Sequence, residues 1–424
     1  MPTPLLYLLA LLWSVTLAPV GWAALLGHGG PVKGIAISAD GRFAVTAGFD
    51  YSVIIWRLAD ESILRRLLGH DGPVNAVALT SDGVTAASAG DDGSVAVWDV
   101  ATGTLRQRLR TQAKLGSIAI SRDDAVIAAG GWDGLVHRWQ LTDGAPLPDL
   151  PSGGERVTAL AFTAGALLAG GHEGSLRAWR GGSQAPVQSP AHDFAVTGVA
   201  VLADGTLLTA STDRTLRRWD AAAMSPIQEL AGHEQPVIAL TASGDAALFA
   251  SAGAKGEVLL WRLGEPHPLR ALAGSGTPIW SLAFAPGGRH LLGGGADGVV
   301  RIWDTATGDQ LGRAVPEPER LAAGRGPRLF AKCAACHSLT ADGGNKAGPS
   351  LAGVLGRRAG TVANYPYSPA LRESGVVWTE EAIARLFDLG PDNFLPGTKM
   401  PLQRLPNPRD RADLIDYLRH AGGR

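Results

Sequence analysis

Short runs of alternating hydrophobic and polar residues dominate the first three quarters of the chain. In the first group they fall at residues 32–38, 43–47, 52–56 and 62–68, and turn-forming residues such as Asp40-Gly41 separate them. Alternation with a period of two is typical of β-strands with one buried face, and Asp-Gly pairs are typical of tight turns. The pattern therefore predicts a group of four short strands.

The same group recurs along the chain, with a tryptophan as its most regular marker. The tryptophans are spaced 42, 41, 40, 40, 42 and 42 residues apart, at Trp56, Trp98, Trp139, Trp179, Trp219, Trp261 and Trp303. Six of these groups carry an acidic turn residue, at Asp50, Asp92, Asp133, Glu173, Asp213 and Asp297. One such sheet cannot bury both of its apolar faces, whereas seven sheets arranged radially bury each face against a neighbour. We therefore predict an all-β propeller of seven blades.

Four of the groups also begin with a Gly-His or Ala-His pair, at His28, His70, His192 and His233. Together with the tryptophans and the turn acids, this pattern resembles the WD40 repeat over residues 24–316. The resemblance implies that each such histidine bonds the turn acid of its own blade, which gives the pairs His28–Asp50, His70–Asp92 and His192–Asp213. The pair is missing from the third, fourth and seventh repeats, and the sixth has Lys255 in place of the acid. We expect these four blades to be less rigid.

The strand that completes the seventh blade is not fixed by the sequence. Residues 309–315 follow the last tryptophan in the position of an outer strand. Residues 24–26, near the expected mature N-terminus, compete for the same place.

The propeller sequence contains no recognisable catalytic set. His137, His172, His267 and His290 fall at unrelated positions of different repeats, and neither a Ser/His/Asp set nor a Gly-rich phosphate loop is present. The formal net charge is −1, and there is no basic stripe of the kind that nucleic-acid binding needs. The WD40 resemblance therefore implies a rigid scaffold on which protein partners dock, although a fold alone does not define a function.

The N-terminal residues resemble a targeting segment. An apolar run at residues 5–17 has the length of a signal-peptide core and is short for a membrane-spanning helix, and small residues follow it at Gly21 and Ala23. No Lys or Arg precedes the run, so an uncleaved membrane anchor stays open as an alternative. We expect residues 1–23 to be a signal peptide and the rest of the protein to be exported to the periplasm.

The two cysteines of the chain lie in one motif, Cys333-Ala-Ala-Cys336-His337. Two thiols at this spacing can form thioether links to the vinyl groups of a haem, with the next histidine on the iron. A dithiol redox pair or half of a zinc site are alternatives, although zinc needs a second pair of ligands and no further cysteine exists. A second axial ligand is commonly a methionine, and Met400 is the only methionine after residue 317.

Residues 324–424 resemble a class I cytochrome c of the mitochondrial and cytochrome c2 type, through the motif above, the segment 348–360 and the Met400 loop at 395–401. The resemblance implies an all-α domain, after a linker at 317–323, that binds one covalent haem c with His337 and Met400 as axial ligands. It implies that the Pro349 carbonyl accepts a hydrogen bond from His337. Contacts to the haem propionates are expected from Arg357, Tyr367, Trp378 and Thr398.

The sequence departs from this family at two places. Phe387 stands where the family has a tyrosine beside the methionine ligand, and we interpret it as a core residue. The basic ring around the haem edge is thin, with Lys332, Lys346 and Lys399. Electrostatic steering of an acidic partner should be correspondingly weak.

We therefore predict a periplasmic electron carrier that catalyses no reaction itself and whose propeller docks redox partners. In one alternative, a catalytic site in the propeller passes electrons to the haem. In another, the chain is a redox sensor whose haem state changes the affinity of the propeller for its partner. Membrane association is expected only if the N-terminal segment is retained.

Overall fold

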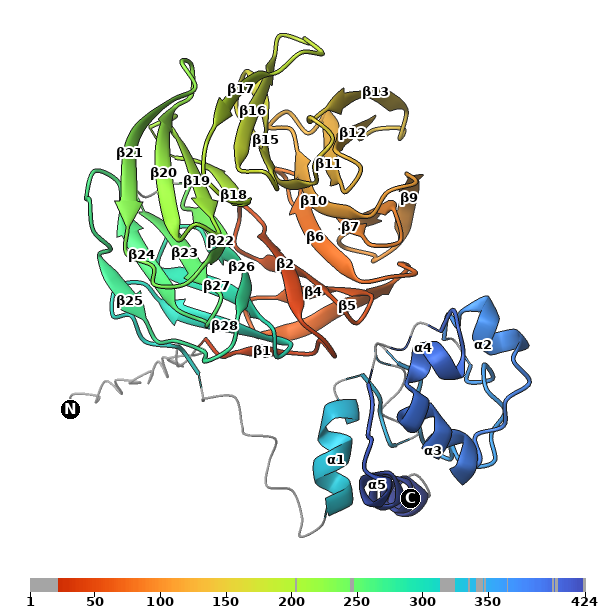
Figure 1. Ribbon diagram of the computed structural model, residues 1–424. Helices are drawn as coiled ribbons and strands as arrows, with labels where there is room; N and C mark the ends of the chain where they lie inside the picture. The colour runs from red at the N-terminus through yellow and green to blue at the C-terminus, as the bar shows by residue number, and fades with distance from the viewer. Residues whose placement is uncertain are drawn as a thin grey trace, which may run out of the picture.

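The computed structural model describes residues 22–202, 204–244, 248–312, 325–334, 336–340, 346, 348–363, 365–398, 400 and 403–421, without the side chains of 331 and 332. It consists of a ring of small β-sheets and a separate group of helices beside the ring (Figure 1). The expected signal peptide at 1–23 lies almost entirely outside the described residues, and so does the expected linker at 317–323.

Seven antiparallel four-stranded sheets form the ring, as the repeats predict. Blades one to three are β2–β5 (Val32–Ile37, Phe43–Gly48, Ser52–Arg57, Ser62–Leu68), β6–β9 (Val74–Leu79, Thr85–Gly90, Ser94–Asp99, Leu105–Arg110) and β10–β13 (Leu115–Ile120, Val126–Gly131, Leu135–Gln140, Pro146–Pro151). Blades four to six are β14–β17 (Val157–Phe162, Ala166–Gly171, Ser175–Arg180, Val187–Pro190), β18–β21 (Val196–Val201, Leu207–Ser211, Thr215–Asp220, Ser225–Ala231) and β22–β25 (Val237–Ala242, Leu248–Gly253, Val258–Arg262, Arg270–Leu272). Blade seven is β26–β28 (Ile279–Phe284, His290–Gly295, Val299–Asp304) with β1 (Leu25–Leu26).

Small residues in the second strand of each blade allow neighbouring sheets to approach closely. In β7, with the sequence Thr-Ala-Ala-Ser-Ala-Gly, every residue is buried. The tryptophan of each third strand packs beside it, and all seven indoles are buried. The hydrophobic core is therefore divided among the interfaces between blades, as radial stacking requires.

The N-terminal strand closes the ring. β1 pairs antiparallel with β28, with Leu25 opposite Val300 and Leu26 opposite Val299. The competing segment forms no strand among its described residues: it contributes an isolated bridge between Trp303 and Gln310 and two backbone hydrogen bonds to β28, at Asp309 and Leu311. Leu25 is 1% exposed and joins a core cluster shared by the first and seventh blades. The two ends of the propeller are thus joined within one sheet.

The three predicted histidine–acid pairs are confirmed. Nδ1 of the histidine lies 3.0, 3.1 and 2.8 Å from a carboxylate oxygen in His28–Asp50, His70–Asp92 and His192–Asp213. The opposite ring nitrogen meets a Thr or Ser hydroxyl that also accepts the indole N–H of the blade tryptophan. These chains of side-chain hydrogen bonds join the incoming loop of one blade to its second and third strands and to the turn between them.

The expected lack of an acid in the sixth blade is wrong. Glu257 lies two residues beyond Lys255, and its Oε2 is 2.9 Å from Nδ1 of His233. The third, fourth and seventh blades have no histidine in the incoming loop. In these blades the turn acid pairs with a basic residue four positions later, on the third strand. These pairs are His137–Asp133 at 3.1 Å, Arg177–Glu173 at 2.6 Å and Arg301–Asp297 at 2.5 Å. Each of the four blades therefore has an acid–base pair of its own.

The helical domain contains α1 (Arg325–Ala334), α2 (Pro369–Glu373), α3 (Glu380–Leu389), α4 (Pro391–Phe394) and α5 (Pro408–Ala421). The first and last helices cross at Gly326, where an added Cβ would lie 2.6 Å from Cβ of Tyr417. The rings of Phe330 and Tyr417 pack 5.5 Å apart beside this crossing. Within the described ranges, no helix is long and apolar enough to span a membrane.

Candidate haem-binding site

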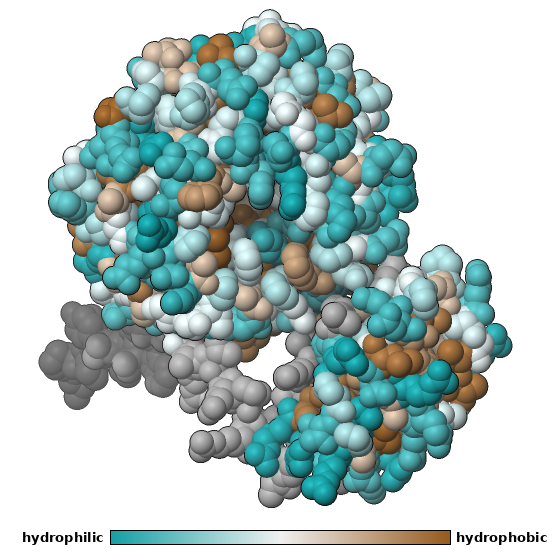
Figure 2. All heavy atoms as spheres, in the orientation of Figure 1, coloured by the Kyte–Doolittle hydropathy of each residue, from teal (hydrophilic) through white to brown (hydrophobic). Residues whose placement is uncertain are grey.

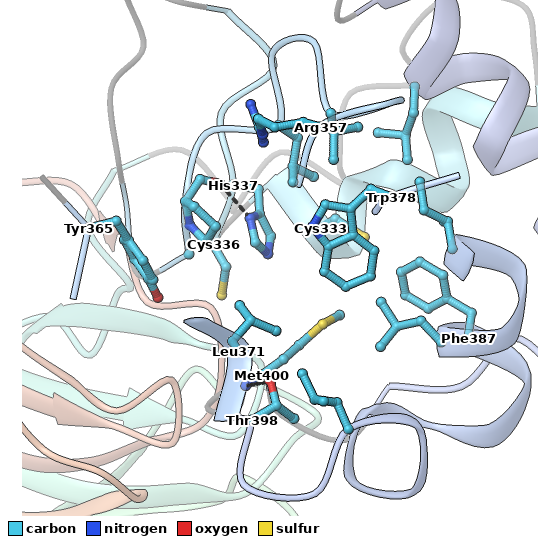
Figure 3. Close-up of a pocket in the computed structure, with 18 of the residues that line it drawn as sticks. Cys333, Cys336, His337, Arg357, Tyr365, Leu371, Trp378, Phe387, Thr398 and Met400 are labelled. Carbon is cyan, nitrogen blue, oxygen red and sulfur yellow. Dashed lines mark hydrogen bonds between the residues drawn. The ribbon is translucent and has the colours of Figure 1, made fainter. Parts of the chain in front are cut away.

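The helical domain surrounds a deep cavity with a mostly apolar lining (Figure 3). Its empty space is about 1180 Å³, its open mouth included. Ligand pockets are typically concave and mostly apolar with a few placed polar groups, which is the character of this cavity. Apolar side chains of α1, α2, α3, α5 and the connecting loops form its walls: Phe330, Leu351, Val354, Leu371, Ile383, Leu386, Leu395, Leu414 and Leu418.

The two thiols line this cavity, Cys333 from the last turn of α1 and Cys336 from the turn that follows this helix. The backbone N–H groups of Cys336 and His337 both donate to the carbonyl of Cys333, at 3.0 and 2.8 Å. This turn places both cysteines against the cavity, and each is 7% exposed. Burial, with a smaller contribution from Asp50, raises the pKa of the Cys336 thiol to about 12. The reactive thiol of a dithiol redox pair is partly exposed, whereas both thiols here are buried, so the site does not favour that alternative.

His337 is held in one orientation. Its Nδ1 lies 2.8 Å from the carbonyl oxygen of Pro349, so this nitrogen carries the proton and the other ring nitrogen is left as the acceptor. The ring packs against Gly348, where an added Cβ would lie 2.6 Å from Nδ1. Burial lowers the pKa of His337, and the hydrogen bond to Pro349 offsets this only in part, so the imidazole is neutral at pH 7. A neutral, oriented imidazole is the form that binds a metal ion.

Met400 approaches the cavity from the opposite side to His337 (Figure 3). Its backbone N–H donates to the Thr398 hydroxyl at 3.3 Å, and the N–H of Thr398 donates to the carbonyl of Leu395 at 3.1 Å. The loop after α4 thus carries the thioether to a place across the cavity from the imidazole.

The four residues expected at the propionates all line the cavity: Arg357, Tyr367, Trp378 and Thr398. Arg357 donates to the backbone carbonyls of Ser350 and Ala352, both at 2.7 Å, which fixes its guanidinium beside the wall. Their role at the propionates stays a prediction.

Phe387 is 6% exposed and packs in the core cluster of the domain. Of the basic ring, Lys346 donates to the carbonyl of Ala334 at 2.6 Å, whereas the side chains of Lys332 and Lys399 lie outside the described residues.

Two further residues at the cavity escaped the sequence reasoning. Tyr365 comes from the loop before α2, and Asp50 comes from the first blade of the propeller. Asp50 carries the usual sequence signal of a turn acid, so nothing in its own repeat marks it as part of this site.

The residues present fit a covalent haem. Paired buried thiols, an oriented neutral imidazole, an opposed thioether and an apolar cavity are all parts that such a group needs, and they meet in one place.

Comparisons with known proteins agree with this fit. The family model described as Cytochrome c matches residues 323–422. The WD domain, G-beta repeat, matches six segments: residues 23–57, 61–99, 103–140, 184–220, 224–262 and 266–304. The unmatched stretch between the third and fourth segments contains β14–β16, which together with β17 form a four-stranded blade like the others.

The relatives lie on the helical domain. Cytochrome c of Chlamydomonas reinhardtii is 44% identical over 98 residues, which are 23% of this chain and 87% of that protein. Cytochrome c of Arabidopsis thaliana is 42% identical over 95 residues, 22% of this chain and 84% of that protein. The chain therefore belongs to the cytochrome c family through its C-terminal domain, joined to a propeller of WD repeats. That domain carries one covalent haem c and transfers electrons, and the propeller is a scaffold.

Proposed function

We propose that this protein is a periplasmic electron carrier whose single haem c has His337 and Met400 as axial ligands. The opposed placement of the two side chains across the cavity carries this proposal (Figure 3). When bound there, haem supplies a one-electron couple. With His337 and Met400 both bound, the iron would have no open position, which would favour electron transfer over ligand chemistry.

The surrounding residues keep this coordination in place. Pro349 holds the tautomer and orientation of His337, and the turn at Cys333 fixes the imidazole relative to the two thiols that would carry the thioether links. The apolar walls exclude water, which lowers the reorganisation energy of each electron transfer to or from the haem.

Optical spectra of the purified full chain test the ligation. We expect one haem per chain and the weak absorption band of a methionine–iron bond in the oxidised protein. Met400→Ala should abolish this band while leaving the covalent haem content unchanged. Met224, which is buried in the propeller, gives the matched control Met224→Ala, which should keep the band. Retention of the band in Met400→Ala would refute the ligand assignment.

We further propose that partners dock on the end of the propeller that faces the haem domain. In these antiparallel blades, the turn between the second and third strands lies at the same end as the loop into the next blade. Trp132 and Phe194 lie at this end and are 42% and 63% exposed. Arg156 stacks on Trp132, 4.3 Å from its ring centre, and Lys114 lies 5.1 Å from it. Exposed aromatic and basic side chains of this kind are enriched at interfaces.

Apolar surface on the haem domain supports the same scheme. Hydrophobic residues gather on the side of that domain shown in Figure 2, over α2–α4, whereas the propeller face in this view is mostly hydrophilic. Capture with the full chain from a periplasmic extract should recover a redox protein, and Trp132→Ala should reduce its recovery. Val187→Ala, an exposed change on the outer strand β17, is the control. Equal recovery by both variants would argue against docking at this end.

Export to the periplasm rests on the N-terminal segment and on haem attachment, which occurs in an exported, oxidising compartment. Cell fractionation should place haem-containing protein in the periplasmic fraction, and mass analysis of the mature N-terminus should show cleavage near residue 23. Retention in washed membranes would favour the uncleaved anchor.

A further inference from the structure

The haem cavity has one wall that the cytochrome domain does not supply. Asp50, at the turn between β3 and β4, lines the cavity together with Cys336 and Tyr365. Tyr365 and Pro366 also meet the first and second blades around a smaller cavity, lined on the propeller side by Asp50, Tyr51, Leu68, Gly69 and His70. The haem domain therefore rests on the rim of the first blade, beside β4 and β5 (Figure 1).

Gly29 lies directly against Cys336. A Cβ added there would overlap Sγ of Cys336 outright and would lie 3.2 Å from its Cβ. In the other repeats that begin with a His pair, the residue after the histidine is acidic, at Asp71, Asp193 and Glu234.

The backbone itself does not require glycine at position 29. Gly29 has no positive φ, and its N–H donates to Asp50 at 2.8 Å, as the N–H of Asp71 donates to Asp92 in the second blade. A side chain is therefore accepted at this position of the repeat, except in the blade that contacts Cys336. The close approach of the second thioether position explains the glycine.

Asp50 brings a fixed charge to the same place. Burial would raise the pKa of this carboxyl, but the neighbouring His28 and the hydrogen bonds from His28 and Gly29 lower it to about 2. Arg66 lies 3.8 Å from Asp50 and opposes its charge, but at the Cys336 thiol the effect of Asp50 is the larger of the two. Asp92 sits in the matching array of the second blade but is not among the described residues that line the haem cavity.

We propose that the first blade forms one wall of the haem site, where Gly29 seats the Cys336 edge and the Asp50 carboxylate lowers the reduction potential of the haem. The propeller thereby closes this edge to other proteins and leaves the opposite side of the haem domain for exchange. The inference rests on the proposed function, since it requires a haem c attached at Cys336. A negative charge beside the haem favours the oxidised state, which carries one more positive charge.

The shielding of the Cys336 edge by the first blade is tested with full-chain Gly29→Asn and a matched control. The control, Asp71→Asn, places the same residue at the equivalent position of the second blade. The probe is ferricyanide, and the measurement is the second-order rate of oxidation of the reduced protein. Gly29→Asn should displace the haem domain and raise this rate about threefold or more, because the Cys336 edge becomes accessible. Asp71→Asn should react as the wild type does. Equal rates in the two variants would overturn the closure.

The charge is tested with Asp50→Asn and its matched control Asp92→Asn. Each removes a carboxylate from the same kind of His–acid array, so the two should lower propeller stability alike. Only Asp50→Asn should shift the redox equilibrium with a reference couple, by about threefold towards reduced haem. This shift corresponds to a rise in reduction potential of about 28 mV, at 59 mV per tenfold change. Equal reduction potentials in both variants would overturn the role of Asp50. This measurement can be made even if Gly29→Asn fails to fold.

The spectrum of the wild type separates the two proposals. A wild type without a six-coordinate c haem would refute the proposed function. A wild type with that spectrum, whose rate and potential are unchanged in all four variants, would refute the wall formed by the first blade and leave the proposed function intact.

Discussion

Gly348→Ala should displace the proximal histidine through a single methyl group. An added Cβ would lie 2.6 Å from Nδ1 and 2.7 Å from Nε2 of His337, whereas ordinary contacts begin at 3.4 Å. Gly348 has no positive φ, so alanine can adopt its backbone conformation and the whole effect falls on the ring. The loop cannot easily yield, because the Gly348 N–H donates to the carbonyl of Cys336 at 2.7 Å.

The expected cost follows from these contacts. Overpacking of a well-packed site costs about 1–3 kcal/mol. A ring displaced far enough to relieve the overlap also loses its hydrogen bond to Pro349, worth about 1 kcal/mol. Together they should lower the stability of the haem domain by about 2–4 kcal/mol. At about 4–8 °C per kcal/mol for a domain of this size, its melting temperature should fall by about 10 °C or more.

Thermal unfolding followed at the Soret band measures this loss, and the absorption of the methionine–iron bond reports whether the axial geometry survives. Gly165→Ala is the control, because its Cβ would meet open space and its φ is not positive. A Gly348→Ala protein with the melting temperature and spectrum of the wild type would refute the steric reasoning.

Three further outcomes are expected in the propeller. Glu257→Gln should destabilise the sixth blade by about 1–2 kcal/mol in urea unfolding, because it removes a charged partner of a buried histidine, whereas Lys255→Gln should stay within about 0.5 kcal/mol; the reverse order would contradict the pairing. Leu25→Ala should cost about 2–5 kcal/mol and the exposed Leu26→Ala far less, since only the first side chain is buried in the closing strand; equal losses would argue against this closure. The pKa of Asp50 is about 2 in the folded protein against 3.8 ordinarily, so its contribution is complete above about pH 4 and is lost as the pH falls towards 2. The unfolding free energy of the wild type should fall more steeply in this window than that of Asp50→Asn, and parallel curves would contradict the assignment.

The sequence was most informative where one local pattern was repeated. The first four strands were predicted at residues 32–38, 43–47, 52–56 and 62–68, and each observed strand agrees within one residue at either end. Alternation and turn residues determine such strands locally, and the seven-fold period then leaves radial stacking as the way to bury both faces. The haem motif was equally local, because two thiols and a histidine on one turn need no distant partner to be recognised.

Contacts between residues that are far apart in the sequence could not be predicted from such local patterns. Residues 24–26 and 309–315 both place a leucine against the core shared by the first and seventh blades, but only Leu25 and Leu26 form a strand with β28. Glu257 was overlooked as the partner of His233 because a repeat fixes the place of a residue in the alignment, whereas a flexible carboxylate reaches an imidazole from two positions away.

The amino-acid sequence by itself determined the two domains, the number of blades and the chemistry of the haem attachment, because each of these depends on residues that are close in the chain or regularly spaced. Only the tertiary structure brought Gly29 and Asp50 of the first blade against Cys336, about three hundred residues away in the sequence. In sequence they look like an ordinary turn acid and a small residue after a histidine. Their role depends on contact between two separately folded surfaces, which no local pattern encodes.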